Sequence, residues 1–256
     1  MKNLIIYNEG FYKDQVDGSY LSAKQVVPVV RNILQNVGSV LDVGCGVGTW
    51  LKAWKECDEK IKVFGIDGNE VVGEFGILDE GNYCKVDLLE EADRVATIVY
   101  EGSGLKKFDL VESLEVAEHL EERYAQNFIK LLTSFSDTVL FSAAIPGQGG
   151  TEHVNEQPPK YWADLFAQFG FLCYDIRYLF WDNPNIEFWY KQNIFLFANK
   201  KNNIKKIVSK YTCEPECLAY PDRTLVKDRI LQSLHNKNKG LMKYIRHPKK
   251  ILEIFQ

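Results

Sequence analysis

The sequence predicts an α/β fold with a seven-stranded, mostly parallel sheet, helices on both faces and an antiparallel last strand. Short apolar runs alternate with amphipathic stretches along most of the chain, as in a succession of strand–helix units. The last two apolar runs have no helical stretch between them, so the final strand is expected to run antiparallel. The 256 residues are 46% hydrophobic and 26% charged, the composition of an ordinary globular protein.

The predicted strands are short apolar runs bounded by glycine, polar or charged residues. Most are rich in Val, Ile, Leu and Phe, as expected for strands buried between two helical layers. They are Ser39–Val43, Lys62–Asp67, Tyr83–Asp87, Phe108–Glu112, Thr138–Ser142, Cys173–Phe180 and Ile194–Ala198.

The predicted helices are the amphipathic stretches between these runs. They cover residues 19–36, Leu51–Cys57, Glu90–Tyr100, Val116–Phe135 and Tyr161–Phe169. Pro28 predicts a break or a late start in the first helix, because proline cannot donate a backbone hydrogen bond. Gly170 directly follows the last helix and is a signal for helix termination.

Charge divides the chain into two parts. Residues 200–256 hold 14 Lys and Arg against five Asp and Glu, a net +9, whereas the remainder holds 17 against 30, a net −13. We therefore expect one domain over residues 1–199 and a basic extension over 200–256, helical in Leu225–His235 and Lys239–Phe255. The acidic domain would repel phosphate backbones, which disfavours duplex nucleic acid as a partner.

Two further features indicate a cytoplasmic protein. No apolar run reaches the roughly 18 residues that a membrane-spanning helix needs. The amino-terminal segment also lacks the small-residue cleavage site of a signal peptide. The six cysteines are accordingly expected to be reduced thiols.

The segment Val40–Trp50, VLDVGCGVGTW, carries the strongest functional signal. A buried strand leads into three glycines, Gly44, Gly46 and Gly48, and a helix follows. Glycines at such a turn let a ligand lie against the backbone. The next strand ends in Asp67, where a carboxylate can accept hydrogen bonds from two ribose hydroxyls.

Two classes of cofactor compete for this geometry. A nicotinamide dinucleotide site has the spacing GxGxxG, whereas this chain has GxGxG followed by Thr49. Asp42 precedes the glycines, where a carboxylate suits an ammonium group and opposes a pyrophosphate. With the acids that end strands two and three, Asp67 and Asp87, the pattern resembles the class I S-adenosylmethionine-dependent methyltransferases, whose domain is Rossmann-like. The resemblance covers about residues 20–198.

The resemblance implies S-adenosylmethionine as the cofactor and gives each residue of the pattern a role. Asp42 would contact the methionine amino group, the glycines would line methionine and ribose, and Asp67 would hold the ribose. The residues placed at the cofactor are Asp42, Gly44, Gly46, Gly48, Asp67, Asp87, Leu88, Glu112 and Ser113. Asp87 and Leu88 would flank adenine, although Asp87 could instead cap the following helix.

A second polar group follows the fourth predicted strand. Glu115, Glu118 and His119 are spaced i, i+3 and i+4, so on a helix they share one face. His153 lies in the loop after the fifth strand. Both segments belong to the carboxyl edge of the sheet, where ligands bind in open α/β folds.

This ExxEH pattern with a later histidine is similar to the metal-dependent plant small-RNA 2′-O-methyltransferases, and the ExxEH segment also resembles the ubiquinone-pathway O-methyltransferases. The resemblance implies a divalent metal, Mg or Mn, on Glu115, Glu118, His119 and His153, with the two histidines also serving as catalytic residues. Two alternatives remain open: His153 is a lone general base, or the group is structural.

The connection before the last strand gathers aromatic and amide side chains, which are Trp181, Trp189, Tyr190 and Gln192. Exposed aromatic faces with amides fit the C–H faces and hydroxyl rims of a sugar. The strings WYKQN and HVNEQ look like those of bacterial methyltransferases found with cell-surface glycan genes, such as those for capsular polysaccharide. The alternative is an aromatic minicore that covers the end of the sheet.

We therefore expect an S-adenosylmethionine-dependent O-methyltransferase that acts on a hydroxyl of a sugar or cell-surface glycan precursor. N-methylation, or O-methylation of a small aromatic metabolite, is the alternative chemistry. A non-catalytic cofactor-binding subunit is a further interpretation, and the sequence is compatible with a homodimer.

Overall fold

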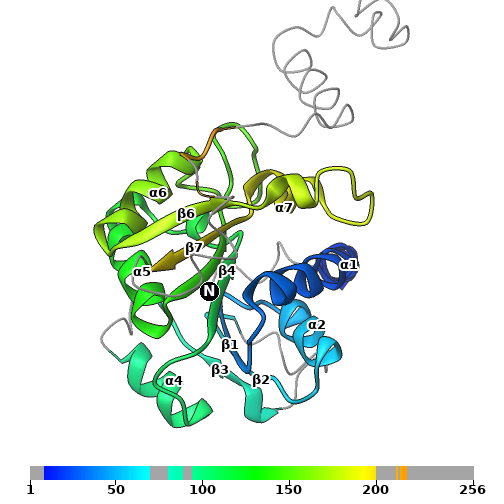
Figure 1. Ribbon diagram of the computed structural model, residues 1–256, viewed down its shortest axis with the longest axis vertical. Coiled ribbons are helices and arrows are strands. Elements are labelled where there is room, and N and C mark those ends of the chain that lie inside the picture. The colour runs from blue at the N-terminus through cyan, green and yellow to red at the C-terminus, as the bar shows by residue number, and fades with distance from the viewer. Residues whose placement is uncertain (1–8, 70–79, 89–93, 200–211, 213, 218–256) are drawn as a thin grey trace, which may run out of the picture. The chain divides into compact units, whose positions relative to one another are not determined.

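The computed structural model describes residues 9–69, 80–88, 94–199, 212 and 214–217. In this part of the chain one sheet contains seven strands. They are β1 (Ser39–Val43), β2 (Lys62–Asp67), β3 (Tyr83–Lys85), β4 (Leu110–Leu114), β5 (Thr138–Ser142), β6 (Phe171–Asp175) and β7 (Phe195–Asn199). Their order is β3-β2-β1-β4-β5-β7-β6 (Figure 1). Only β7 runs antiparallel to its neighbours, β5 and β6, so the predicted sheet is confirmed.

Helices cover both faces of this sheet (Figure 1). The α-helices are α1 (Glu9–Leu34), α2 (Thr49–Cys57), α4 (Val95–Ser103), α5 (Glu122–Phe135), α6 (Pro159–Gln168) and α7 (Phe188–Asn193). Three short 3₁₀ turns are η1 (Glu80–Asn82), η2 (Ala117–His119) and η3 (Arg177–Leu179).

Two apolar cores result, one on each face of the sheet. The first joins α1, α2 and α7 to the sheet and contains Val27, Trp54 and Tyr190. The second joins α4, α5 and α6 to the opposite face and contains Phe128 and Phe166. Because successive strand residues point to opposite faces, both faces of the central strands are buried. Most polar side chains therefore gather at the strand ends and in the loops that follow, whereas Glu112 is buried in the middle of β4.

The strand predictions differ from the structure mainly at strand ends. β1, β2 and β5 have the predicted bounds. β3 ends at Lys85, before Asp87, and β4 is shifted two residues toward the carboxyl end. β6 ends at Asp175 because its carboxylate accepts hydrogen bonds from the Arg177 backbone N–H at 3.0 Å and from the Arg177 side chain, which turns the chain into η3.

The predicted break at Pro28 is wrong. α1 continues through Pro28, which lies on the exposed side of the helix. The opposite side buries Ala23, Val27 and Val30 completely against the first core. Burial of such side chains stabilises the helix by about 1.5–3 kcal/mol each, which outweighs the hydrogen bond that proline cannot donate.

Two helix predictions change the candidate site. The stretch predicted as one helix over Val116–Phe135 is a 3₁₀ turn, η2, followed by α5, which begins only at Glu122. The α4 helix begins at Val95 rather than at Glu90, although residues 89–93 lie outside the described part. α6 begins two residues before its prediction because Pro159 suits the first helical turn.

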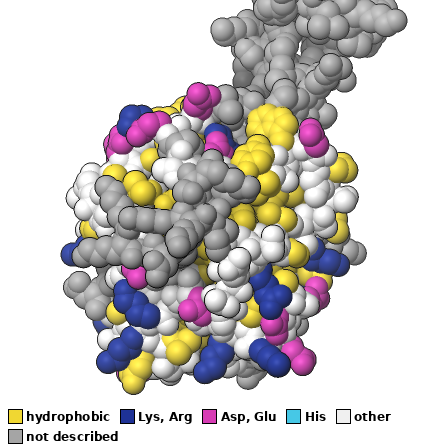
Figure 2. All heavy atoms as spheres, viewed as in Figure 1, with side chains coloured by type: hydrophobic (Ala, Val, Ile, Leu, Met, Phe, Trp, Pro, Cys, Tyr) yellow, Lys and Arg dark blue, Asp and Glu magenta, His cyan; other side chains and the backbone are white. Residues whose placement is uncertain are grey.

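The described residues all belong to the first of two units into which the chain divides, Met1–Leu218 and Ala219–Gln256. Thr212 forms an antiparallel bridge with Tyr174 of β6, and Pro215 is buried. The predicted helices Leu225–His235 and Lys239–Phe255 lie outside the described residues. Within those residues, no helix is both long and apolar enough to cross a membrane. Acidic and basic side chains are intermixed over the face shown in Figure 2.

Candidate functional site

The glycine loop, Gly44–Gly48 between β1 and α2, has the backbone geometry that the motif predicts. Gly44, Gly46 and Gly48 have φ values of 84°, 50° and 85°, a region that side-chain-bearing residues avoid. A Cβ on Gly44 would lie 2.4 Å from Val116 Cγ2, so this glycine packs against the segment before η2. Nothing surrounds a Cβ built on Gly46, which leaves that backbone open to a ligand.

Three carboxyl groups, from Asp42, Asp67 and Glu112, act on one another beside this loop. Asp42 and Glu112 are paired in register on β1 and β4, so their side chains share a face of the sheet. Burial raises the pKa of Glu112 to about 8, and its Oε1 has no hydrogen-bond partner. Burial, and then the charges of Glu112 and Asp67, raise the pKa of Asp42 well above its ordinary value. The three carboxyl groups together favour the binding of a cation.

Asp67 fixes the loop from the end of β2. Its Oδ2 accepts the Gly46 backbone N–H at 2.8 Å, and its Oδ1 accepts the Asn69 backbone N–H at 2.9 Å. Each carboxylate oxygen has two lone-pair sites, so both oxygens can still accept a hydroxyl. This is where the sequence predicts the ribose.

The other predicted cofactor residues differ from one another in how far they are buried. Asp87 is exposed beyond β3 and Leu88 is half-buried. The N-cap of α4 is Arg94, and residues 89–93, where Asp87 could cap a helical start, lie outside the described residues. Ser113 is fully buried, and its hydroxyl donates to the Val43 carbonyl at 2.8 Å, which ties β4 to β1.

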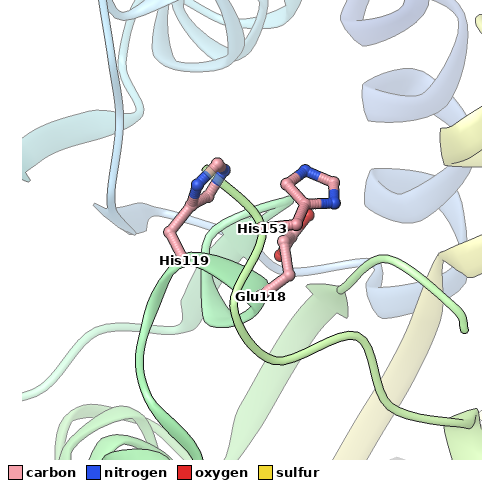
Figure 3. A group of neighbouring side chains, drawn as sticks. All are labelled: Glu118, His119 and His153. Carbon is pink, nitrogen blue, oxygen red and sulfur yellow. The ribbon is translucent and has the colours of Figure 1, made fainter. Parts of the chain in front are cut away.

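Glu118, His119 and His153 form the second part of the site (Figure 3). One possible ligand atom from each residue lies within 4.8 Å of the others. The two imidazole rings meet edge to face, with centroids 5.0 Å apart. Figure 3 shows all three side chains projecting to the same side of the ribbon, two from η2 and one from the loop after β5. Since Val116 packs on Gly44, this cluster adjoins the glycine loop.

The Glu118 carboxyl group is fully buried, close to the Glu115 carboxyl group. Burial, and then the charge of Glu115, raise its pKa well above the ordinary value, although hydrogen bonds with the Glu118 and Ala144 backbone oppose this rise. Partial desolvation, and then His153, lower the pKa of His119, which favours its neutral, ligating form. Burying a carboxyl group beside a second carboxyl group is costly unless a cation compensates for their charge. Carboxylate and imidazole are also the donors that first-row divalent ions accept, so the residues fit such an ion.

Backbone bonds hold His153 beside Glu118. The backbone N–H groups of Val154 and Asn155 both donate to the Glu118 carbonyl, at 2.9 and 3.0 Å. The Nδ1 atom of His153 lies 3.0 Å from Glu156 Oε1. Burial would raise the pKa of Glu156, but hydrogen bonds from His153 and from two backbone N–H groups outweigh it and lower that pKa.

Glu115 does not share a helical face with Glu118 and His119, contrary to the prediction, although its carboxyl group lies beside that of Glu118. Its φ is 57°, and the chain turns there instead of forming an α-helix. Its Oε1 accepts a hydrogen bond from Asn193 Nδ2 at 3.0 Å, and its Oε2 accepts one from Gln148 Nε2 at 2.9 Å. The carboxylate therefore belongs to an amide network.

That network connects α7 to the loop after β5. Gln148 Oε1 accepts hydrogen bonds from Gln192 Nε2 at 2.9 Å and from Asn193 Nδ2 at 2.8 Å. Gln192 and Asn193 are buried, and Asn193 Oδ1 has no partner. We conclude that α7 is fixed to the site by polar contacts, not only by its aromatic residues.

The expected exposed wall of aromatic and amide side chains is wrong for two of its four members. Tyr190 and Gln192 are only 7% and 3% exposed. Tyr190 packs edge-on against Trp50, with ring centroids 5.0 Å apart, because α7 turns it toward the first core. Burial raises the pKa of Tyr190 to about 12. Trp181 and Trp189 are half-buried and remain candidate acceptor contacts.

Sequence reasoning missed Glu156 and Gln148 as parts of the site. The available signal for Glu156 was its spacing three residues after His153. For Gln148 it was the flanking glycines, which predict a tight polar loop. Asn193 was expected only among the amides beside a sugar, and no local pattern predicts its contacts with Glu115 and Gln148.

No protein-family model matches the sequence, and a search of curated proteins gives no match. Solved structures do show similarity. The S-adenosylmethionine-dependent methyltransferase from Archaeoglobus fulgidus is 19% identical, with a TM-score of 0.52 over 75% of this chain and 100% of that chain. Magnesium protoporphyrin IX methyltransferase from Synechocystis PCC 6803 is 22% identical, with a TM-score of 0.50 over 72% and 80%. DesVI of Streptomyces venezuelae is 13% identical, with a TM-score of 0.51 over 74% and 95%. The chain shares the fold of these proteins.

Proposed function

We propose that this chain is an S-adenosylmethionine-dependent O-methyltransferase whose acceptor is a hydroxyl group of a sugar or glycan precursor. The observation that carries the proposal is the Glu118 carboxyl group, buried beside the Glu115 carboxyl group and two imidazoles. It lies at the carboxyl edge of the sheet and next to the glycine loop. A fold that merely bound a nucleotide would have no compensation for such a group.

The glycine loop and its acids support the cofactor. The amino group of S-adenosylmethionine is a cation, which suits Asp42 and the unpartnered Oε1 of Glu112. Asp67 retains acceptor capacity for ribose hydroxyls beyond its backbone bonds. Gly46 leaves its surroundings open for the ligand. When bound, this cofactor supplies an electrophilic methyl group on a sulfonium centre.

The Glu118–His119–His153 cluster supports a divalent ion, with Mg²⁺ or Mn²⁺ expected. Such an ion would lower the pKa of a hydroxyl in the same way that it lowers the pKa of water. Glu118 would supply a carboxylate, and the two histidines would supply neutral imidazole nitrogen. Three protein ligands leave room for two neighbouring hydroxyls, a pair that sugars commonly offer and that a simple amine lacks. This chemistry supports a sugar hydroxyl as the acceptor.

Two alternatives are tested by the same assay. If no ion is needed, His153 would take the hydroxyl proton as the oxygen–methyl bond forms and the methyl–sulfur bond breaks. If the acceptor is a small aromatic metabolite or an amine, the half-buried Trp181 and Trp189 would line its site instead of a sugar face. A non-catalytic subunit would bind the cofactor and transfer nothing.

The test is methyl transfer by the purified full chain to a panel of nucleotide-activated sugars, a catechol and a primary amine. Each acceptor is assayed with Mg²⁺, with Mn²⁺ and with excess EDTA. We expect transfer to one sugar, lost in EDTA and restored by the ion. Transfer in EDTA would overturn the metal role, and transfer only to the amine or the catechol would overturn the acceptor class.

A further inference from the structure

We propose that Glu156 is a positioning residue that fixes His153 in one tautomer, with hydrogen on Nδ1 and a free electron pair on Nε2. This inference rests on the proposed function, because it assigns a supporting group to the same cluster. Glu156 lies outside the group of possible metal ligands.

The Glu156 carboxylate is surrounded by hydrogen-bond donors. Its Oε1 lies 3.0 Å from His153 Nδ1 and accepts the Gly149 backbone N–H at 2.6 Å. Its Oε2 accepts the Gly147 backbone N–H at 2.7 Å. Gly147 and Gly149 have φ values of 83° and 70°, so this loop conformation depends on glycine. Backbone hydrogen bonds therefore hold both oxygens of the carboxylate in position, in addition to its contact with the imidazole.

Hydrogen-bond chemistry then determines the tautomer. An ionised carboxylate can only accept hydrogen bonds, so the hydrogen between the two groups belongs to His153 Nδ1. A neutral imidazole carries one N–H, which leaves the electron pair on Nε2. Ligating histidines commonly donate their other N–H to a carboxylate, which orients the ring and raises its basicity.

The neighbouring glycine keeps the Nε2 edge uncovered. A Cβ built on Gly150 would lie 2.2 Å from His153 Nε2. Any side chain at this position would occupy the space in which Nε2 meets a ligand or push the ring away. Glu156, on one side of the imidazole, leaves the electron pair on Nε2. Gly150, on the other side, leaves space for a ligand beside the same Nε2 atom.

The loop has other supports, so the role of Glu156 can be tested without unfolding it. The Gln148 backbone N–H donates to the Ile145 carbonyl at 3.0 Å, and the backbone N–H groups of Val154 and Asn155 donate to Glu118. Glu156→Gln keeps the side-chain length and one carbonyl acceptor. It also places amide hydrogens near backbone N–H donors, which weakens the contact with Nδ1.

The deciding experiment is nitrogen-15 NMR of the imidazoles in the full chain without added metal. The chain has four histidines, and His153→Gln identifies the His153 signals by their disappearance. We expect a protonated Nδ1 and an unprotonated Nε2 at His153 in the wild type, and loss of this preference in Glu156→Gln and Glu156→Ala. Glu152→Gln, an exposed acid of the same loop whose charge acts on His119, is the matched control and should leave the His153 tautomer unchanged. A hydrogen on Nε2 in the wild type would overturn the inference.

A second measurement links the tautomer to the cluster. Mn²⁺ affinity, followed by electron paramagnetic resonance, should fall about ten- to a hundredfold in Glu156→Gln. In a His153→Ala background the same change should have no further effect, because Glu156 acts through that ring. Additive losses would mean a purely structural role and would overturn the inference. If the wild type bound no Mn²⁺, the proposed metal role would fail, while the NMR result would still decide the tautomer.

Discussion

The glycine loop and the Glu118–His119–His153 cluster adjoin each other, yet the chain builds them in different ways. The glycine loop is one continuous segment, and its geometry comes from the end of β1 and from positive φ values. The cluster is assembled from two segments more than 30 positions apart in sequence, joined by hydrogen bonds from Val154 and Asn155 to the Glu118 carbonyl. The glycine loop is defined by its backbone conformation, and the Glu118–His119–His153 cluster is defined by its side chains.

This difference suggests a division of tasks. A backbone-defined loop can bind a cofactor that many proteins of one fold share, since it needs few side chains. A cluster carried by loops can change its side chains without disturbing the sheet. We therefore expect substitutions in the cluster to remove reaction and leave cofactor binding, and substitutions at the glycine loop to do the reverse.

The largest effect is expected from Glu118→Gln. The carboxyl group is buried beside Glu115, and burial raises its pKa, so a neutral amide of equal size should leave the melting temperature unchanged or higher. Loss of an ion ligand removes several kcal/mol of transition-state stabilisation, which corresponds to about 10³-fold in the rate of methyl transfer. Radiometric transfer assays and calorimetric cofactor titration measure the two properties.

Glu122→Gln, an exposed acid a few residues away on α5, is the control and should retain full activity. Undiminished transfer by Glu118→Gln in excess EDTA would show that the cluster does not act through an ion.

Asp67→Ala tests the glycine loop, the other region in the comparison. The carboxylate holds Gly46 and is expected to hold the ribose, and hydrogen bonds to a charged group contribute about 1.5–3 kcal/mol each. We expect S-adenosylmethionine binding to weaken by about 10- to 100-fold in calorimetry, with Mn²⁺ affinity of the cluster unchanged. Asp164→Asn, an exposed acid paired with Lys160, is the control. Tight binding of NADH in place of S-adenosylmethionine would contradict the assignment.

The sequence alone was sufficient to predict the site residues whose positions depend on where a strand ends. Asp42 and Asp67 terminate runs whose apolar character is unambiguous, and both β1 and β2 have the predicted bounds. The antiparallel last strand was also predicted correctly, although the connection before it contains the short helix α7, which the prediction did not include. These features depend on local pattern and on chain connectivity alone.

Prediction from the sequence failed for side chains whose positions depend on tertiary contacts. Spacing placed Glu115 on a face shared with Glu118, but its backbone adopts φ 57° and its carboxylate meets Gln148 and Asn193. These partners lie 33 and 78 positions along the chain. Tyr190 was expected at the surface, yet it packs on Trp50, which is 140 positions away. No local pattern encodes contacts of this kind.

Gly150→Ala is expected to have a smaller effect and sharpens the comparison within the cluster. The added methyl would meet His153 Nε2 at 2.2 Å, so the imidazole at the end of its side chain must shift to make room. We expect transfer activity to fall about tenfold, a free-energy change of about 1.4 kcal/mol, with cofactor affinity unaffected. Gly81→Ala is the control, because nothing surrounds its Cβ and its backbone is unstrained. Equal activity of the two variants would mean that the Nε2 edge of His153 is not used.

The smallest effect concerns Glu112, the one buried side chain of the backbone-defined region whose charge changes in the neutral range. Burial raises its pKa from 4.5 to about 8. Its favourable contribution to folding is therefore complete below pH 4.5 and is lost as the pH rises toward 8. The slope from one such proton is at most about 1.4 kcal/mol per pH unit.

Glu112→Gln should remove this part of the pH dependence and make the protein more stable than the wild type at pH 8, as measured by urea unfolding between pH 5 and 8. Because Asp42 faces Glu112 across β1 and β4, the cationic amino group of S-adenosylmethionine should stabilise the ionised pair. Saturating cofactor should therefore flatten the wild-type curve and leave the variant's curve nearly unchanged. Parallel curves for wild type and variant without cofactor would mean that Glu112 is already ionised in the folded protein. The glycine loop would then bind its ligand through backbone and Asp67 alone, with no buried proton to displace.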